Sequence, residues 1–164
     1  MTLDEERGVS KTRILVVCLG NICRSPMAEG IFLDRVRRRG WSDRVAIDSA
    51  GTAAYHAGEP PDPRTLAELG RHGIALDSRA RQVQDDDFEA FDWILAMDSS
   101  NFDRLRQRCP AERRDRVAMM LEPVGGGDVA DPYYGGLDGF ARNFQQLDRA
   151  VDAWLDRIQA SATP

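Results

Sequence analysis

The sequence has few cysteines and no long apolar run. Three of its 164 residues are cysteine, namely Cys18, Cys23 and Cys109. An odd number this small does not make a disulfide framework, and under reducing conditions a cysteine in a distinctive loop is more often reactive than structural. No apolar stretch approaches the roughly 20 residues that a membrane helix needs, and the opening residues MTLDEERGVSK lack the apolar core of a signal peptide. We therefore expect a cytoplasmic protein.

Lysine is also scarce, because Lys11 is the only lysine and the other basic residues are arginine, and the formal net charge is −5. This balance argues against a general binder of nucleic acid or of membrane surfaces. A run of arginines at residues 35 and 37–39 is interpreted as the solvated end of a helix, where cations favour the negative end of the dipole. A docking patch for phosphoproteins is the less favoured interpretation of this run.

The chain length fits one domain with a single core. We expect residues 1–11 to form a flexible N-terminal tail and residues 12–160 to form a single domain, and we expect a monomer.

Apolar, β-branched runs predict buried strands at residues 13–18, 44–49, 91–97 and 117–121. Helices are predicted at residues 64–71 and 102–108 and, from seven apolar residues on one face, at 140–158. The alternation predicts an α/β domain with a parallel sheet, whose ligands bind where strands end in loops.

The loop after the first predicted strand holds the most informative residues. Cys18 ends the strand, and Ser25-Pro26 opens a helix that ends at Gly40, since serine is a favoured N-cap and proline a favoured first helical residue. Backbone N–H groups of the intervening loop and the helix N-terminus form an anion cradle that would stabilise a Cys18 thiolate. Arg24 closes this cradle with a planar fork that suits two phosphate oxygens.

Other interpretations of this loop are weaker. Cys18 alone could be a buried cysteine that packs at a strand end, with Arg24 in a surface ion pair, but that does not explain the whole pattern. The nucleotide-binding loop G-x-x-x-x-G-K-[ST] is absent. A zinc site is disfavoured because Cys18 and Cys23 have the wrong spacing and no second ligand pair follows. The sequence therefore favours a cysteine nucleophile in a phosphate-binding loop.

A phosphate ester also needs a proton for its leaving oxygen, and Asp131 is the best candidate acid. It lies in a glycine-rich loop and is followed by Pro132, Tyr133 and Tyr134. On the residues alone this assignment is weak, because Asp-Pro in a loop is most often a turn.

Six segments, in order along residues 13 to about 158, resemble the low-molecular-weight protein tyrosine phosphatase family. They are VCLGNICRSPMAEG (Val17 to Gly30), DSAGT (Asp48 to Thr52), RHGI (Arg71 to Ile74), ARQ (Ala80 to Gln82), FDWILAMDSSN (Phe91 to Asn101) and DPYYG (Asp131 to Gly135). The resemblance implies a four-stranded parallel sheet with helices on both faces and a phosphate-binding loop after the first strand. It also implies that Cys18 is the nucleophile, Arg24 the phosphate binder and Asp131 the general acid and base.

The resemblance extends to the residues around these three. It implies a substrate-binding set of Leu19, Gly20, Asn21, Ile22, Cys23, Ser25, Tyr55 and Tyr133, with Ser49 supporting the loop. One position departs from the family, because Ser78 stands where many relatives carry a histidine in the network that supports the loop. Serine can form a hydrogen bond there but cannot carry charge. His72 is assigned no role.

The expected reaction is hydrolysis of phosphotyrosine in proteins through a phosphocysteine, with no metal or other cofactor because Arg24 and the loop amides supply the positive charge. An arsenate reductase is the first alternative, but it needs a downstream pair of redox cysteines and only Cys109 lies downstream. A non-catalytic phosphotyrosine-binding module is the second, although Cys18, Arg24 and Asp131 are all present.

Two cysteines in one loop also suggest that Cys23 traps an oxidised Cys18 as a disulfide; alternatively, Cys23 only packs beneath the loop.

Overall fold

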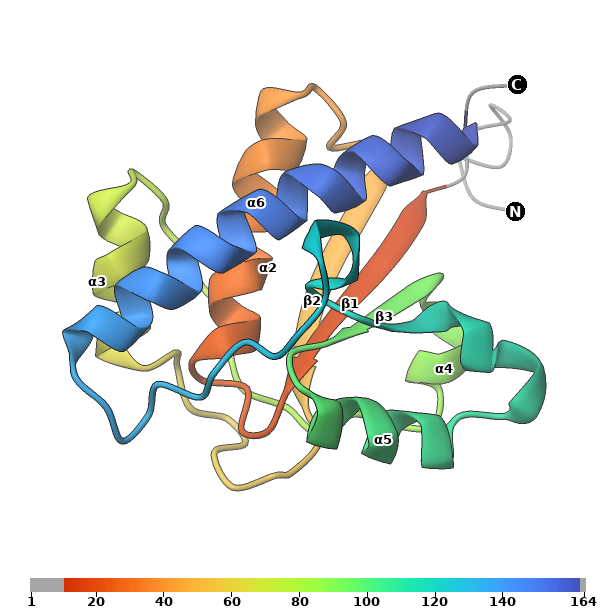
Figure 1. Ribbon diagram of the computed structural model, residues 1–164, viewed down its shortest axis with the longest axis horizontal. Helices are drawn as coiled ribbons and strands as arrows, with labels where there is room; N and C mark the ends of the chain where they lie inside the picture. Colours follow the sequence, from red (N-terminus) through yellow and green to blue (C-terminus); the bar gives the residue numbers. More distant parts are fainter. Residues whose placement is uncertain (1–10, 163–164) are drawn as a thin grey trace.

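A computed structural model describes residues 11–162 and contains a four-stranded sheet in the order β2-β1-β3-β4 (Figure 1). The strands are β1 (Thr12–Cys18), β2 (Val45–Gly51), β3 (Trp93–Ala96) and β4 (Val117–Met119). Every pairing is parallel, so the predicted parallel α/β sheet is confirmed. The predicted tail falls outside the described residues except for Lys11.

Strand β1 lies in the middle of the sheet because both of its faces are apolar. Ile14 and Val16 belong to the core on one face, whereas Leu15 and Val17 belong to the core on the other. All four side chains are fully buried, and burial of each such side chain contributes about 1.5–3 kcal/mol to folding. This packing carries the chain to Cys18 at the carboxyl end of the sheet.

Helices cover both faces of the sheet, as the resemblance implied. Helices α2 (Arg24–Arg38), α3 (Pro63–Arg71) and α6 (Leu137–Ala162) pack on one face, where α6 lies across α2 and reaches α3 (Figure 1). The short helix α4 (Asp87–Ala90) and α5 (Ser99–Arg108) lie on the other, and two 3₁₀ segments, η1 (Ala111–Arg116) and η2 (Glu122–Val124), flank β4. Because β1 and β3 end at one edge, the loops after them meet there.

Helix α2 corrects one prediction about its start. The helix begins at Arg24 with Cys23 as its N-cap residue, and no side chain caps it. Ser25 lies inside the first turn and its hydroxyl turns to the Cys18 thiol instead, so the predicted Ser25 N-cap was wrong. The predicted stop at Gly40 is correct: Gly40 has φ 72°, and the N–H of Trp41 donates to Val36 O at 2.9 Å, as expected for a glycine-terminated helix.

The arginine run at the end of α2 is only partly solvated. The Arg37 and Arg38 side chains are 70% and 63% exposed, but Arg35 and Arg39 turn to α6, where Arg35 pairs with Asp148 and Arg39 with Asp156. Two of the four arginines therefore tie α2 to α6. The predicted apolar face of α6 is confirmed, with Phe140, Phe144, Leu147, Val151, Trp154 and Leu155 all buried and Ile158 packed against them.

Candidate active site

The loop after β1 curls around the sulfur of Cys18. The backbone N–H of Asn21 donates to Cys18 Sγ at 3.3 Å, and Ser25 Oγ lies 3.1 Å from the same sulfur. The Cys18 side chain is buried and forms the base of a cavity of about 140 Å³. The cavity thus has a sulfur at its floor and a polar hydrogen directed at that sulfur from at least one side.

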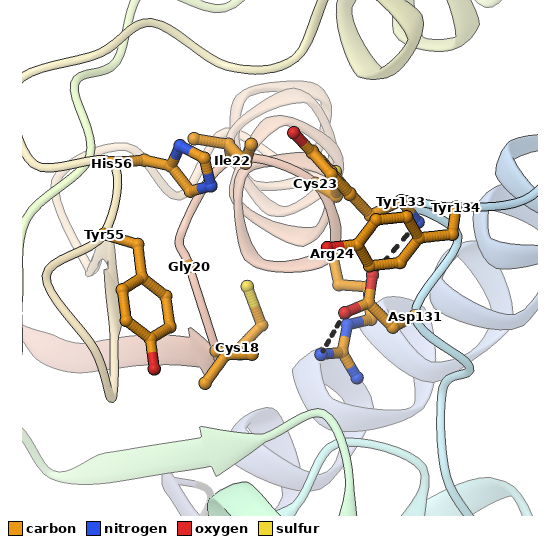
Figure 2. Close-up of a pocket in the computed structure, with 11 residues that line it drawn as sticks. Cys18, Gly20, Ile22, Cys23, Arg24, Tyr55, His56, Asp131, Tyr133 and Tyr134 are labelled. Carbon is orange, nitrogen blue, oxygen red and sulfur yellow. Dashed lines mark hydrogen bonds and ion pairs between the residues drawn. The ribbon is translucent and has the colours of Figure 1, made fainter.

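Two groups of side chains form the walls of this cavity (Figure 2). Tyr55 and His56 lie on one side, with Asp131, Tyr133 and Tyr134 on the other. The loop contributes Leu19, Gly20, Ile22, Cys23 and Arg24. Tyr55 is 76% exposed and Tyr134 is 95% exposed, so these two rings stand at the mouth of the cavity.

Arg24 is held from three directions. Its Nη1 donates to Asp98 Oδ2 at 2.6 Å and to Val129 O at 2.9 Å, while Nη2 lies 3.6 Å from Asp131 Oδ2. Burial lowers the pKa of Arg24, but the negative charges of Cys18, Asp98 and Asp131 outweigh it and raise the pKa overall. The guanidinium is therefore a permanent, oriented positive charge beside the sulfur.

A hydrogen-bonded chain runs behind the loop, and Asn21 lies at its centre. Asn21 has φ 60°, a left-handed conformation that asparagine tolerates. Its Oδ1 accepts from the N–H of Arg81, which orients the amide so that Nδ2 donates to Ser25 Oγ at 2.8 Å and to Ser49 Oγ at 3.0 Å. Because Ser25 Oγ accepts from Asn21, the Ser25 hydroxyl keeps its own hydrogen, for which the Cys18 sulfur at 3.1 Å and Ala50 O at 3.4 Å are the two acceptors.

The same chain ends at a buried carboxyl group, that of Glu29. Ser49 Oγ donates to Glu29 Oε1 at 2.5 Å, and Ser78 Oγ donates to it at 3.1 Å. Burial raises the pKa of Glu29, and the two serine hydroxyls offset this rise only in part. Ser78 thus supplies a hydrogen bond at the position where many relatives carry histidine, and it supplies no charge.

Asp131 lies on a loop that is tied to the sheet and to α6. The N–H of Val129 donates to Met97 O at 2.8 Å, and Asn143 Nδ2 donates to Ala130 O at 3.1 Å. The Asp131 side chain is 44% exposed, and its Oδ1 accepts from the N–H of Tyr133 at 3.1 Å. A half-exposed carboxyl group thus faces the cavity from the side opposite Tyr55.

Three free cysteines occupy different environments. Cys23 lies beside Cys18 in the cavity wall, and burial, followed by the charges of Asp62, Cys18 and Asp131, raises its pKa to about 12. Cys109 is buried in the core on the opposite face of the sheet. Cys23 is therefore a protonated thiol at neutral pH, and Cys109 is remote from the cavity.

The structure brings most of the predicted site residues together. Asn21, Ser25 and Ser49 are the exceptions, because their side chains lie behind the loop and do not line the cavity. Sequence reasoning missed Asp98, Glu29 and His56. Asp98 carries one sequence signal, since Asp-Ser-Ser-Asn after a strand is typical of a helix start, and Asp98 indeed caps α5. His56 lines the cavity with its Nδ1 atom 2.6 Å from Glu59 Oε2.

Residues 11–162 contain neither a metal-binding cluster nor a membrane-spanning helix. No three histidine, cysteine or acidic side chains in this range are placed to share a metal ion. Within the same range, every helix is too short or too polar to cross a membrane.

Comparison with known proteins identifies relatives along nearly the whole chain. The family model described as low molecular weight phosphotyrosine protein phosphatase matches residues 13–163. A low molecular weight protein-tyrosine-phosphatase of Streptomyces coelicolor is 46% identical over 90% of this chain and 93% of the relative. One from Schizosaccharomyces pombe is 47% identical over 82% of this chain and 89% of the relative.

Solved structures agree with the fold. The crystal structure of a protein tyrosine phosphatase from Entamoeba histolytica, with Hepes in its active site, has a TM-score of 0.90 at 35% identity and covers 93% of this chain and 100% of its own. The YwlE arginine phosphatase, solved as a cysteine-to-serine mutant with a phosphorylated active site serine, has a TM-score of 0.82 at 29% identity. It covers 90% of this chain and 96% of its own.

Proposed function

Because the chain belongs to the low molecular weight phosphotyrosine protein phosphatase family, we propose that it hydrolyses phosphotyrosine in proteins through a phosphocysteine formed on Cys18. The observation that carries this proposal is the position of the Cys18 sulfur, at the floor of a cavity between a loop N–H, a serine hydroxyl and the Arg24 guanidinium. The remaining residues are assigned by what each contacts.

In the first step the Cys18 thiolate attacks phosphorus while the bond to the phenolic oxygen breaks. Arg24 and the loop N–H groups hold the other phosphate oxygens, where negative charge must be stabilised. Asp131, as the carboxylic acid, gives its proton to the departing oxygen, and tyrosine leaves. This role suits the place of Asp131 on the cavity wall, within 3.6 Å of Arg24.

In the second step the Asp131 carboxylate takes a proton from water, and the water oxygen attacks phosphorus as the sulfur–phosphorus bond breaks. Inorganic phosphate and the Cys18 thiolate are the products. The Ser25 hydroxyl, 3.1 Å from the sulfur, stabilises the thiolate as it leaves. The serine-trapped phosphate in the YwlE arginine phosphatase is consistent with a covalent intermediate at the equivalent position.

Phosphoarginine is the rival substrate, because one of the similar structures is an arginine phosphatase. Two observations favour phosphotyrosine for this chain. Tyr55 and Tyr133 flank the cavity on opposite sides, as suits an aromatic ring between them. The most similar relatives reported above are named tyrosine phosphatases.

The test compares peptides of one sequence that carry phosphotyrosine or phosphoarginine, with a metal chelator present throughout. We expect the higher kcat/KM for phosphotyrosine, and no phosphate release by Cys18→Ser, which should still bind vanadate. A higher kcat/KM for phosphoarginine would overturn the substrate while leaving the cysteine chemistry in place. Substantial turnover by a clean Cys18→Ser preparation would overturn the mechanism itself.

We also place the enzyme in the cytoplasm as a monomer that acts on phosphotyrosine-containing proteins. The three cysteines are free thiols, and a catalytic thiolate beside a second thiol is best preserved in a reducing compartment. The arsenate reductase alternative is disfavoured because Cys109 is buried on the opposite face of the sheet and cannot relay electrons from Cys18.

A further inference from the structure

The first turn of α3 lies between the phosphate-binding loop and the loop that carries Asp131. On the phosphate-loop side, the N–H of Asp62 donates to Ile22 O at 2.8 Å. Thr65, the third residue of the helix and fully buried, donates from Oγ1 to Cys23 O at 3.3 Å. The start of α3 is therefore bonded to two consecutive carbonyl groups of the loop that surrounds Cys18.

Asp62 fixes the conformation of Arg64 in this turn. Asp62 is the N-cap residue of α3, and its Oδ1 accepts from the backbone N–H of Arg64 at 2.8 Å. The Arg64 side chain donates to both carboxylate oxygens, from Nε at 3.0 Å and from Nη2 at 2.8 Å. These hydrogen bonds from Arg64, ahead of any other cause, lower the pKa of Asp62. Such a bidentate pair holds a guanidinium plane in one orientation.

The opposite side of that guanidinium reaches the Asp131 loop. It lies over the ring of Tyr133, 5.6 Å from the centroid, and over the ring of Phe140, at 4.7 Å. Its Nη1 lies 3.5 Å from Gly135 O. The backbone N–H of Tyr133 is the group that donates to Asp131 Oδ1, so Arg64 contacts the residue that orients the acid.

We propose that Arg64 is a positioning residue that sets the place of Asp131 relative to the phosphate-binding loop, through the bridge Ile22–Asp62–Arg64–Tyr133. It touches no reacting atom and acts only through the acid. This inference rests on the proposed function, since it requires that Asp131 protonate a leaving group. In this proposal α3 joins the phosphate-binding loop to the loop that carries Asp131, and these two loops are more than 100 residues apart in the sequence.

The experiment measures kcat/KM for aryl phosphates whose phenols span a range of acidity. General acid catalysis contributes about 10²–10⁴-fold, and an activated phenol needs little of it. We expect Arg64→Ala to lower kcat/KM about tenfold for substrates with poor leaving groups. For substrates with activated leaving groups, the loss should be less than about threefold. Arg64→Lys should recover part of the loss, because it keeps a cation over the rings without the fork to Asp62.

Arg71→Ala is the matched control. Arg71 lies in the last turn of the same helix and pairs with Glu68, away from the cavity. It should leave the dependence on leaving group unchanged. Thermal unfolding of each variant separates a loss of the fold from a loss of the position of Asp131. If Arg64→Ala does not fold, the dependence of kcat/KM on the leaving group is measured with Arg64→Lys.

A double-mutant cycle with Asp131→Asn decides the mechanism of the effect. If Arg64 acts through the acid, adding Arg64→Ala to Asp131→Asn costs little further activity. An Arg64→Ala loss equal for all leaving groups, or one that adds in full to Asp131→Asn, would overturn the proposal. Failure of the proposed function looks different, because the unmodified enzyme would then show no turnover of these substrates.

Discussion

Asp98 and Arg24 form an ion pair in the site, with Oδ2 of the aspartate 2.6 Å from Nη1 of the arginine and both side chains largely buried. Asp98 also caps α5, since its Oδ1 accepts from the N–H of Asn101 at 2.8 Å. One carboxylate thus ties the end of β3 and the start of α5 to the phosphate clamp on α2. The position of Arg24 depends on a residue 74 positions away in the chain.

The first prediction is that Asp98→Asn weakens phosphate binding and turnover without destroying them. The variant keeps an oxygen for the cap of α5 but loses the charge opposite Arg24, and hydrogen bonds to charged groups contribute about 1.5–3 kcal/mol. Because Val129 O still accepts from Arg24, we expect kcat/KM to fall about tenfold, less than for Arg24→Ala.

Asp128→Asn is a suitable control for that variant, because Asp128 accepts hydrogen bonds from Ser99 at the start of the same helix and makes no contact with Arg24. Inhibition by inorganic phosphate gives binding, and steady-state kinetics give turnover. Equal losses in Asp98→Asn and Asp128→Asn would show that the helix start, and not the charge opposite Arg24, is what matters.

The second prediction concerns Glu29 and pH. Burial raises the pKa of its carboxyl group above the value in the unfolded chain, so the folded state binds the proton more tightly. Below the unfolded pKa the carboxyl group is protonated in both states, so a change of pH there does not alter the free energy of unfolding through this group. As pH rises through the unfolded and then the folded pKa, the free energy of unfolding falls, because the buried carboxyl must ionise.

Glu29→Gln removes this dependence while keeping an oxygen for Ser49 and Ser78. We expect its free energy of unfolding, relative to wild type, to rise as pH increases from 4 to 8. Denaturant unfolding across that range measures it, with the half-exposed Glu122→Gln as control. Parallel curves for wild type and Glu29→Gln would contradict the prediction.

The parts of the site that could be predicted from sequence are those encoded in consecutive residues. Cys18 through Arg24 follow a buried strand and precede a helix, so the strand and helix patterns alone placed the loop. Glu29 could not be found in this way, because its partners Ser49 and Ser78 lie 20 and 49 residues away. Only the packing of α2 against the sheet brings these three together.

Two predictions made from neighbouring residues were wrong because the side chains bond to residues distant in the sequence. Ser25 has the residue type and the following proline of an N-cap, yet its hydroxyl contacts Cys18 and not the helix N–H groups. Similarly, a solvated helix end was predicted for the arginine run, but Arg35 and Arg39 found acidic partners on α6. The four strands and the helices α2, α3, α5 and α6 were predicted because they depend on the hydrophobic period, whereas α4 was not predicted and these contacts depend on the final packing.

The third prediction concerns oxidation. Peroxide oxidises the Cys18 thiolate to a sulfenic acid with release of hydroxide, and the Cys23 thiolate can then displace hydroxide from that sulfenic acid to form a disulfide. Because the pKa of Cys23 is raised to about 12, little thiolate exists at neutral pH. We expect the disulfide to form slowly and faster as pH rises, and dithiothreitol to restore activity.

Mass spectrometry of peroxide-treated enzyme detects the disulfide, and recovered activity measures protection. Cys23→Ser should recover less than wild type, because its sulfenic acid proceeds to irreversible forms. Cys109→Ser, which removes a thiol on the opposite face of the sheet, should recover as wild type does. Equal recovery in all three proteins would show that Cys23 only packs beneath the loop.

The last prediction concerns the depth of the cavity and the choice of phosphoamino acid. Cys18 is buried at the floor of the cavity, so a substrate must reach down to it past Leu19 and the tyrosines. A phosphotyrosine ring is long enough, whereas phosphoserine holds phosphorus much nearer the peptide backbone. We expect kcat/KM for a phosphotyrosine peptide to exceed that for the matched phosphoserine peptide by orders of magnitude.

Tyr55 should contribute only modestly to this preference, because its side chain is 76% exposed. An aromatic pair contributes about 0.5–1.5 kcal/mol beyond its buried area, which corresponds to about 2–13-fold in KM. Tyr55→Ala should raise KM for aryl phosphates within that range and leave the inhibition constant of inorganic phosphate unchanged, since we expect phosphate to bind at the floor of the cavity and not at its mouth, where Tyr55 lies. Comparable kcat/KM values for the phosphoserine and phosphotyrosine peptides in wild type would mean that depth does not select the substrate, even if the chemistry at Cys18 is as proposed.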